Sequence, residues 1–159
     1  MHTVHCDGGT AACQIFPVCY TLVMDITLQT GLWAEKTETV TEDNTAQSWG
    51  SGGLPVYATP AMIALMEMAA AAAVQGALPE GWSTVGTRLD VRHLSASPPA
   101  MRVRARAELI AVDGRALNFR VEAFDEAGKI GEGTHGRFIV EDRPFVKKAM
   151  EKAGKSPPR

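Results

Sequence analysis

Residues 58–78 read ATPAMIALMEMAAAAAVQGAL, and Glu67 is the only charged side chain among them. Thr59 followed by Pro60 predicts the N-cap and first turn of a helix, and Gly76 predicts its end. A helix that is apolar on nearly every side has to be buried. The sequence therefore predicts one long buried helix, which the rest of the chain must cover.

Glu67 is the unusual residue of this helix. A carboxylate in an apolar helix is unfavourable unless it is paired, protonated or used in chemistry. The alternatives are a surface position or a neighbouring hydroxyl group that satisfies it. A membrane span is not expected, because the run after Glu67 ends at Gln75 and is mostly alanine, whereas a bilayer core requires about 20 apolar residues. A buried carboxyl group can accept a proton at neutral pH, so Glu67 is a candidate catalytic base.

The composition is that of an ordinary globular protein. Of 159 residues, 45% are apolar and 21% are charged, and the formal net charge is -2. This balance gives no reason to expect a nucleic acid or a membrane as partner. The three cysteines lie in the first twenty residues, which fits a cytoplasmic protein without disulfides; they are Cys6, Cys13 and Cys19. No zinc spacing joins them to His2 or His5, so no metal is expected.

Three regions are expected along the chain. Residues 1–30 form an N-terminal extension that is poorly ordered or precedes the true start, with Met24 as an alternative first residue. The extension has an apolar stretch but no Lys or Arg before Lys36, so the basic segment of a signal peptide is absent. Residues 31–143 form one folded domain. Residues 144–159 form a short basic helix and tail.

The second half of the chain has a period of two, which is typical of strands. Leu89, Val91 and His93 share one face, so His93 is expected to point toward the core, whereas His135 is expected on the outer face beside Arg137. The other inward rows are Val103, Ala105 and Ala107, then Leu117, Phe119, Val121 and Ala123, then Ile130, Thr134, Phe138 and Val140.

The expected order is a first strand over 32–41, a long loop, the buried helix and four strands in an antiparallel meander. The loop is rich in Gly and Ser and is a candidate lid or binding loop. A helix apolar on nearly every side needs a sheet that curls around it. The prediction is an α+β hotdog fold, with an antiparallel sheet of about five strands wrapped around one long buried helix.

Thr59, Glu67 and His93 together supply a hydroxyl group, a base and an orienting donor. Each has a simpler interpretation, since Thr59 can be a capping residue and His93 a core histidine. Eight helical residues separate Thr59 from Glu67 by about 12 Å, too far for a hydrogen bond. They can share a site only if a second chain supplies one of them or if the first turn is irregular. We predict a homodimer with its sites at the subunit interface.

Three blocks of the sequence resemble the hotdog-fold fluoroacetyl-CoA thioesterase and its relatives. They are ATPAMIALME, VRHLSASPP and GEGTH, and the resemblance extends over about residues 54–152. By position, the catalytic Thr, Glu and His of the family fall on Thr59, Glu67 and His93. A glycine that lines the acyl pocket of the family falls on Gly86.

The resemblance implies that residues 31–143 are a hotdog thioesterase domain that hydrolyses an acyl thioester of coenzyme A. No cofactor is implied apart from the coenzyme A of the substrate. Glu67 would act as base or transient nucleophile, Thr59 at the thioester carbonyl, and His93 in proton transfer and at the oxyanion. Attack by a side chain and attack by water both remain open.

The sequence does not identify the acyl group of the substrate, and it leaves a second function open. The phenylalanine gate of the specialised enzyme would fall near Gly53, so a short-chain or aromatic acyl group fits as well as fluoroacetyl; Trp49 and Tyr57 are the aromatic residues nearby. A basic stripe on the outer sheet face could bind phosphates or simply be solvated; it would comprise Arg88, Arg92, Arg102, Arg104 and Arg106. The alternative function is a non-catalytic acyl-CoA or acyl-carrier binding module. Further pairing of dimers remains open.

Overall fold

The computed structural model describes residues 26–154. The cysteines, Met24 and most of the predicted 1–30 extension lie outside this range. The elements in chain order are β1 (Trp33–Thr39), the 3-10 turn η1 (Glu42–Asn44), α1 (Ala46–Trp49), α2 (Thr59–Gln75), β2 (Trp82–His93), β3 (Arg102–Asp113), β4 (Ala116–Phe124), β5 (Lys129–Glu141) and α3 (Asp142–Glu151).

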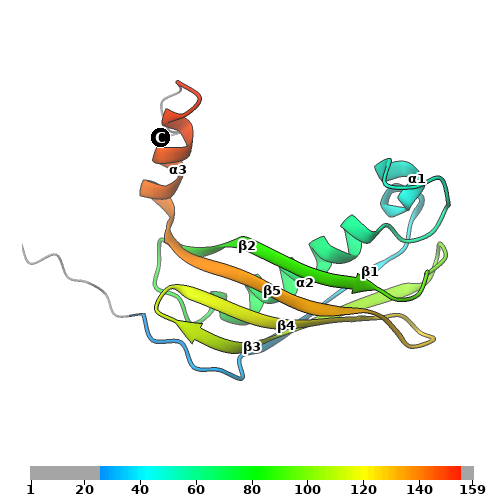
Figure 1. The fold of residues 1–159 in the computed structure, drawn as a ribbon, viewed down its shortest axis with the longest axis horizontal. Coiled ribbons are helices and arrows are strands. Elements are labelled where there is room, and N and C mark those ends of the chain that lie inside the picture. Colours follow the sequence, from blue (N-terminus) through cyan, green and yellow to red (C-terminus); the bar gives the residue numbers. More distant parts are fainter. Residues whose placement is uncertain (1–25, 155–159) are drawn as a thin grey trace, which may run out of the picture.

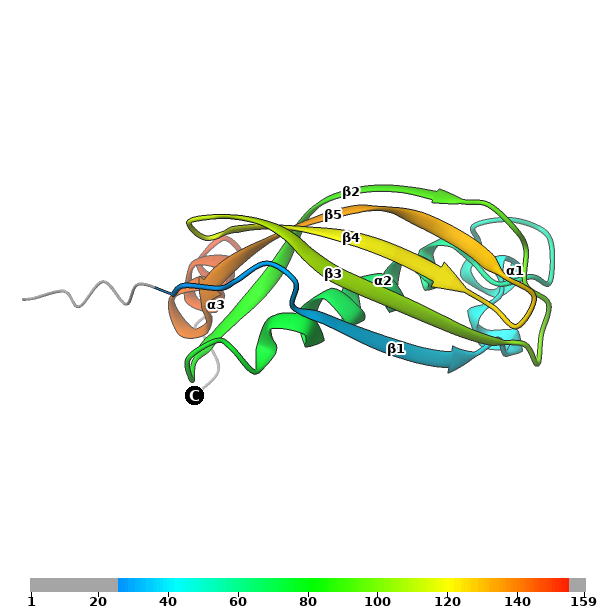
Figure 2. The ribbon, with the colours of Figure 1, turned by 90° about the horizontal axis from the view of Figure 1, so that it is seen from below.

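The five strands form one antiparallel sheet in the order β1-β3-β4-β5-β2. The sheet curls, and α2 lies along its concave face (Figures 1 and 2). This is the predicted α+β hotdog architecture, and the prediction is confirmed. α3 follows β5 directly and projects from one end of the molecule (Figure 1). None of the helices within residues 26–154 is long and apolar enough to cross a membrane.

One part of the predicted topology is wrong, because β2 does not belong to the meander. Strands β3, β4 and β5 follow one another as neighbours, but β2 pairs with β5 at the far edge of the sheet. The connection from β2 to β3 spans residues 94–101 and contains Pro98 and Pro99. It is too long for a tight hairpin turn, so the chain crosses to the other side of the sheet.

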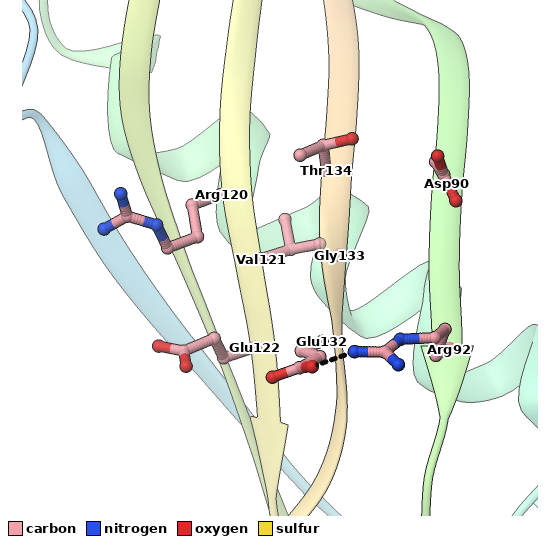
Figure 3. Close-up of a pocket in the computed structure, with 8 residues that line it drawn as sticks. All are labelled: Asp90, Arg92, Arg120, Val121, Glu122, Glu132, Gly133 and Thr134. Carbon is pink, nitrogen blue, oxygen red and sulfur yellow. Dashed lines mark hydrogen bonds and ion pairs between the residues drawn. The ribbon is translucent and has the colours of Figure 1, made fainter.

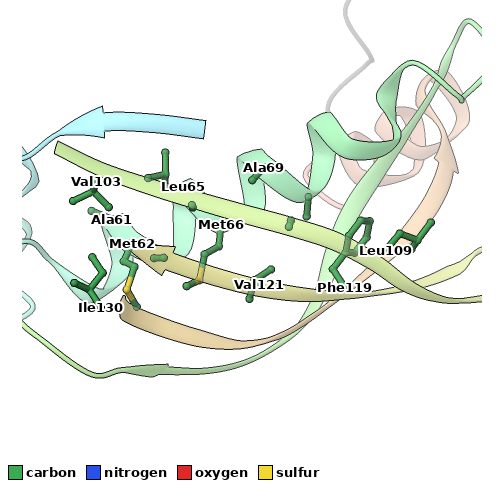
Figure 4. Packing of buried hydrophobic residues seen from close by; sticks show 14 of the residues in the cluster. Ala61, Met62, Leu65, Met66, Ala69, Val103, Leu109, Phe119, Val121 and Ile130 are labelled. Carbon is green, nitrogen blue, oxygen red and sulfur yellow. The ribbon is translucent and has the colours of Figure 1, made fainter. Parts of the chain in front are cut away.

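The core lies between α2 and the inner faces of the strands (Figure 4). The helix buries one side, consisting of Ala61, Met62, Leu65, Met66, Ala69, Ala70 and Val74. The predicted inward rows of β3 and β4 are confirmed, since Val103, Ala105, Ala107, Leu117, Phe119, Val121 and Ala123 are all buried. Each large apolar side chain buried here contributes about 1.5–3 kcal/mol. The other side of α2 is uncovered in the single chain, where Met68 is 51% exposed.

The predicted faces of β5 are wrong between its two ends because the strand contains a β-bulge; the predicted inward residues Ile130 and Val140 are buried. The pairing passes from Ala123 with Gly131 to Phe124 with Lys129, which leaves Ile130 unpaired. After such a bulge the opposite set of residues faces the core. His135 and Ile139 are therefore buried against the helix, whereas Phe138 is 40% exposed.

The predicted arginines lie on the outer face of the sheet, but they do not form one continuous stripe. The arginines of β3 lie near one edge of the sheet and those of β2 at the other, with β4 and β5 between them. Most have local partners: Arg104 pairs with Glu35, Arg92 pairs with Glu132, and Arg106 stacks on Trp33. The shallow hollow between the two edges has mixed charge (Figure 3); it is lined by Asp90, Arg92, Arg120, Val121, Glu122, Glu132, Gly133 and Thr134. This part of the outer face is therefore not a continuous basic patch.

Two glycines of β5 explain how closely the sheet curls. A Cβ at Gly133 would overlap the backbone of β2 at Asp90 and Val91. A Cβ at Gly131 would lie 2.5 Å from Sδ of Met62 on α2. The absence of side chains at these positions lets the edge strand and the helix approach β5.

We predict that Gly133→Ala lowers the free energy of unfolding by at least about 2 kcal/mol, because backbone has to move. Gly131→Ala should cost less, since the flexible end of Met62 can give way. Gly53→Ala is the matched control, because no atom lies within 4 Å of its Cβ position. Urea unfolding of the three variants measures the order, and equal losses at 131 and 133 would contradict this explanation of the curl.

Candidate active site

Thr59 and His93 form the first group of the site. Thr59 is the first residue of α2, and Ala58 occupies the N-cap position without a side-chain hydrogen bond. The prediction that Thr59 is the N-cap is therefore wrong by one residue. Its hydroxyl group is instead free to bind His93, and Thr59 Oγ1 lies 2.8 Å from His93 Nδ1. The two groups are placed to share a proton.

The other nitrogen of His93 has no partner. Nε2 is buried and makes no hydrogen bond among the described residues. Leaving such a group unsatisfied costs about 1–3 kcal/mol. A cavity of about 350 Å³ adjoins the pair, and its lining includes Val56, Tyr57 and Leu94. His93 thus lines the cavity, while its buried Nε2 is left without a hydrogen-bond partner in the single chain.

Tyr57 is one of the residues that line this cavity. It is buried, and its hydroxyl group donates a hydrogen bond to the carboxylate of Glu38. Burial, followed by the hydrogen bond and negative charge of Glu38, raises the pKa of Tyr57. The ring is therefore held in place as a neutral donor and is not free to swing as a gate. Trp49 on α1 is half exposed, and Gly53 lies in open space.

Glu67 belongs to a second group. Its Oε1 lies 3.6 Å from His135 Nε2 and 3.8 Å from Arg137 Nη1. Gly86 faces it from β2, where a Cβ would come within 2.5 Å of that oxygen. The Glu67 side chain is 38% exposed. The carboxylate is therefore only partly buried, because the side of α2 away from the core is open, and Arg137 provides an opposite charge.

Arg137 is the residue that the sequence reasoning missed. Its Nε donates to Thr84 Oγ1 at 2.8 Å, its Nη2 to the Thr84 carbonyl at 2.7 Å, and its Nη1 to His135 Nε2 at 3.1 Å. Burial lowers the pKa of Arg137, but a guanidinium remains charged at neutral pH. Alternation assigned it to the outer face, so only the bulge at Ile130 could have revealed it.

The two groups lie apart on one rigid helix. α2 is continuous from Thr59 to Gln75, so the alternative of an irregular first turn is excluded. Thr59 and Glu67 are therefore separated by about 12 Å along the helix axis. The single chain holds a hydroxyl–imidazole pair (Thr59 and His93) in one place and a carboxylate–guanidinium group (Glu67 and Arg137, facing Gly86) in another.

The described residues, 26–154, contain no cluster of three or more His, Cys, Asp or Glu side chains that could hold a metal ion. The chemistry available from this chain is that of a carboxylate, an imidazole, a hydroxyl group and a buried guanidinium.

Comparisons with known proteins agree on one family. Residues 40–143 match the sequence model of the fluoroacetyl-CoA-specific thioesterase family. The fluoroacetyl-CoA thioesterase of Streptantibioticus cattleyicolor is 40% identical over 97 residues, which cover 61% of this chain and 70% of that protein.

Solved structures give the same result. The fluoroacetyl-CoA thioesterase FlK superimposes with a TM-score of 0.73 at 32% identity, covering 79% of this chain and 98% of that one. A thioesterase superfamily member from Thermus thermophilus has a TM-score of 0.73 at 31% identity, covering 80% and 94% of the two chains.

Proposed function

Because this chain belongs to the fluoroacetyl-CoA-specific thioesterase family and is a thioester hydrolase, we propose that it hydrolyses a small acyl thioester of coenzyme A at a site shared by two copies. One observation carries the proposal. The hydroxyl–imidazole pair and the carboxylate–guanidinium group both border the inner face of β2, yet one rigid helix holds Thr59 and Glu67 apart.

Glu67 acts as the base or as a transient nucleophile. Its carboxylate is partly exposed and accepts no hydrogen bond from the described residues, while Arg137 lies 3.8 Å away. It is therefore free to take a proton from water or to attack the acyl carbon itself. In either route the C–S bond breaks, water supplies the hydroxyl group of the acid, and the sulfur of coenzyme A receives a proton.

Thr59 and His93 act at the carbonyl and the leaving group. The unpartnered Nε2 of His93 can bind the developing oxyanion or deliver the proton to sulfur. The Thr59 hydroxyl group fixes the ring through Nδ1. The alternative function is an acyl-CoA binding module that does not hydrolyse the thioester. Such a module would need the cavity but not an unpaired histidine nitrogen beside a hydroxyl group, so this pair favours the hydrolase.

The acyl group is proposed to be small but not restricted to fluoroacetyl. The family, the Streptantibioticus cattleyicolor enzyme and FlK are described by fluoroacetyl-CoA, whereas the Thermus thermophilus protein is described only as a thioesterase superfamily member. In this chain the position expected for an aromatic gate is Gly53, with open space around it, and Tyr57 is held by Glu38. Without an aromatic gate at this position, the proposed substrates include short-chain and aromatic acyl thioesters as well as the fluoroacetyl thioester.

Three features support pairing of two copies along β2. Residues 86–90 are exposed although they lie within a strand, and such an open edge is suited to pair with another strand. The uncovered side of α2 carries the exposed Met68, and Glu67 of the same helix faces Gly86 of this edge strand. α3 and α1 both project past β2, one at each of its two ends (Figure 1).

Charge favours one register for an antiparallel pair of β2 strands. With Leu89 on the two-fold axis, Arg88 lies opposite the partner's Asp90, and the same contact occurs twice. Thr87 is the unpaired extra residue of a β-bulge in β2. When that residue is left out of the count, Gly86 lies opposite the partner's Val91, and the partner's His93 is its diagonal neighbour, about 7–8 Å away. A second copy in this register would bring a hydroxyl–imidazole pair next to Glu67.

We predict that Glu67→Gln lowers the rate of acyl-CoA hydrolysis at least about a hundredfold, because the amide cannot act as base or nucleophile. A thiol trap with a panel of acyl-CoA substrates measures turnover. Glu80→Gln, at an exposed turn, is the matched control and should retain the full rate. A near wild-type rate for Glu67→Gln would contradict the proposal; saturable binding without turnover of any substrate by the unaltered protein would favour the binding module.

We further predict that Leu89→Cys, in a background with Cys6, Cys13 and Cys19 changed to serine, forms a disulfide between two copies under mild oxidation. Residues on the two-fold axis of an antiparallel pair lie about 4.5–5.5 Å apart, within disulfide reach. Arg92→Cys on the same strand is the control and should not cross-link to itself. A monomer at micromolar concentration by light scattering, with no cross-link, would contradict pairing along β2.

A further inference from the structure

His135 is a buried titratable group with no part in the chemistry above. Its side chain is fully buried in β5, on the inner face opposite Leu89. The ring of Phe119 packs beside it, with a centroid distance of 6.4 Å. Nε2 of the ring lies beside both Nη1 of Arg137 and Oε1 of Glu67, and the ring does not line the cavity at Thr59 and His93.

The neighbours of His135 define its protonation state. Nδ1 lies 2.9 Å from the carbonyl oxygen of Arg88, which can only accept, so Nδ1 carries the proton. Nε2 lies 3.1 Å from Nη1 of Arg137, which can only donate, so Nε2 carries the lone pair. The ring is therefore neutral, and the 3.6 Å approach of Glu67 Oε1 to Nε2 is not an ion pair. The charge that faces Glu67 is that of Arg137.

Each edge of the Arg137 guanidinium has its own anchor. Thr84 of β2 holds Nε and Nη2. His135 holds Nη1, the nitrogen that also lies 3.8 Å from Glu67 Oε1. Nη1 has two hydrogens, and one of them is directed to Nε2. The imidazole thus controls where the nitrogen nearest the carboxylate lies.

We propose that His135 is a positioning residue, a neutral hydrogen-bond acceptor that aims Arg137 at Glu67 and so holds the carboxylate in its working orientation. The inference rests on the proposed role of Glu67. His135 itself touches neither substrate nor the reacting atoms. A displacement of about 1 Å in a reacting group can cost about a hundredfold in rate, so an anchor of this kind affects turnover more than binding.

Acidification should release this anchor. The charged groups that face the ring are Glu67 from α2 and Arg137 from β5, while β2 offers only the Arg88 carbonyl oxygen. Burial, together with the charge of Arg137, lowers the pKa of His135, so the ring stays neutral at neutral pH. The unfolded chain protonates near the ordinary value of 6.5. Stability from the neutral ring is therefore present above pH 6.5 and is lost as the pH falls through the lower folded-state pKa.

The test compares His135→Leu with His135→Gln. Leucine removes the acceptor, and kcat should fall at least about tenfold while KM changes less than about threefold. Glutamine keeps an acceptor oxygen, and should recover kcat to within about threefold of the unaltered enzyme. Because glutamine does not titrate, the acid limb of its pH–rate profile should move to lower pH.

A second comparison separates this role from a merely structural one. In a Glu67→Gln background, His135→Leu should cause no further loss of kcat, because His135 acts through the carboxylate. An equal loss in both backgrounds, or no rescue by glutamine, would overturn the proposal. If Glu67→Gln alone were fully active, the proposed function would fail; if Glu67→Gln were impaired and His135→Leu were fully active, only this inference would fail.

One measurement does not depend on the folding of any variant. Long-range nitrogen–proton NMR of the unaltered protein, assigned with His135→Gln, should show His135 with a protonated Nδ1 and a bare Nε2 at neutral pH. A protonated Nε2 would overturn the proposal.

Discussion

A continuous α-helix cannot fold back on itself, and the site of this protein depends on that constraint. α2 carries Thr59 in its first turn and Glu67 two turns later. The same helix also fills the concave face of the sheet with Met62, Leu65 and Met66, so it cannot bend without opening the core. The distance between the hydroxyl group and the carboxylate is therefore a property of the fold, and the chemistry has to accommodate it.

The rest of the site follows from how closely the sheet wraps this helix. Glycines at 131 and 133 let α2 and β2 approach β5, and Gly86 leaves room for the carboxylate of Glu67. The buried guanidinium of Arg137, anchored by Thr84 and His135, provides the charge opposite that carboxylate. The core and the site thus share their elements, because the strands that cover the apolar side of α2 also present polar groups to Glu67.

Local patterns in the sequence were sufficient to predict much of this fold. Alternation correctly placed the inner faces of β3 and β4, and turned His93 toward the helix. It failed on β5, because one unpaired residue at Ile130 exchanges the two faces and leaves no trace in the composition. That failure concealed Arg137 and assigned His135 to the wrong side. The pairing of β2 with β5 and the partial exposure of Glu67 are tertiary properties, which no local pattern contains.

The central claim is that Glu67 of one copy works with Thr59 and His93 of another, and mixed dimers test it most directly. Glu67→Gln and His93→Asn copies, each inactive alone, are unfolded together, refolded and assayed. Half of the dimers are then mixed and one of the two sites in each is intact, so about a quarter of the wild-type rate should return. If each chain held a complete site, every mixed dimer would lack Glu67 in one site and His93 in the other. No recovery in dimers shown to be mixed would contradict the claim.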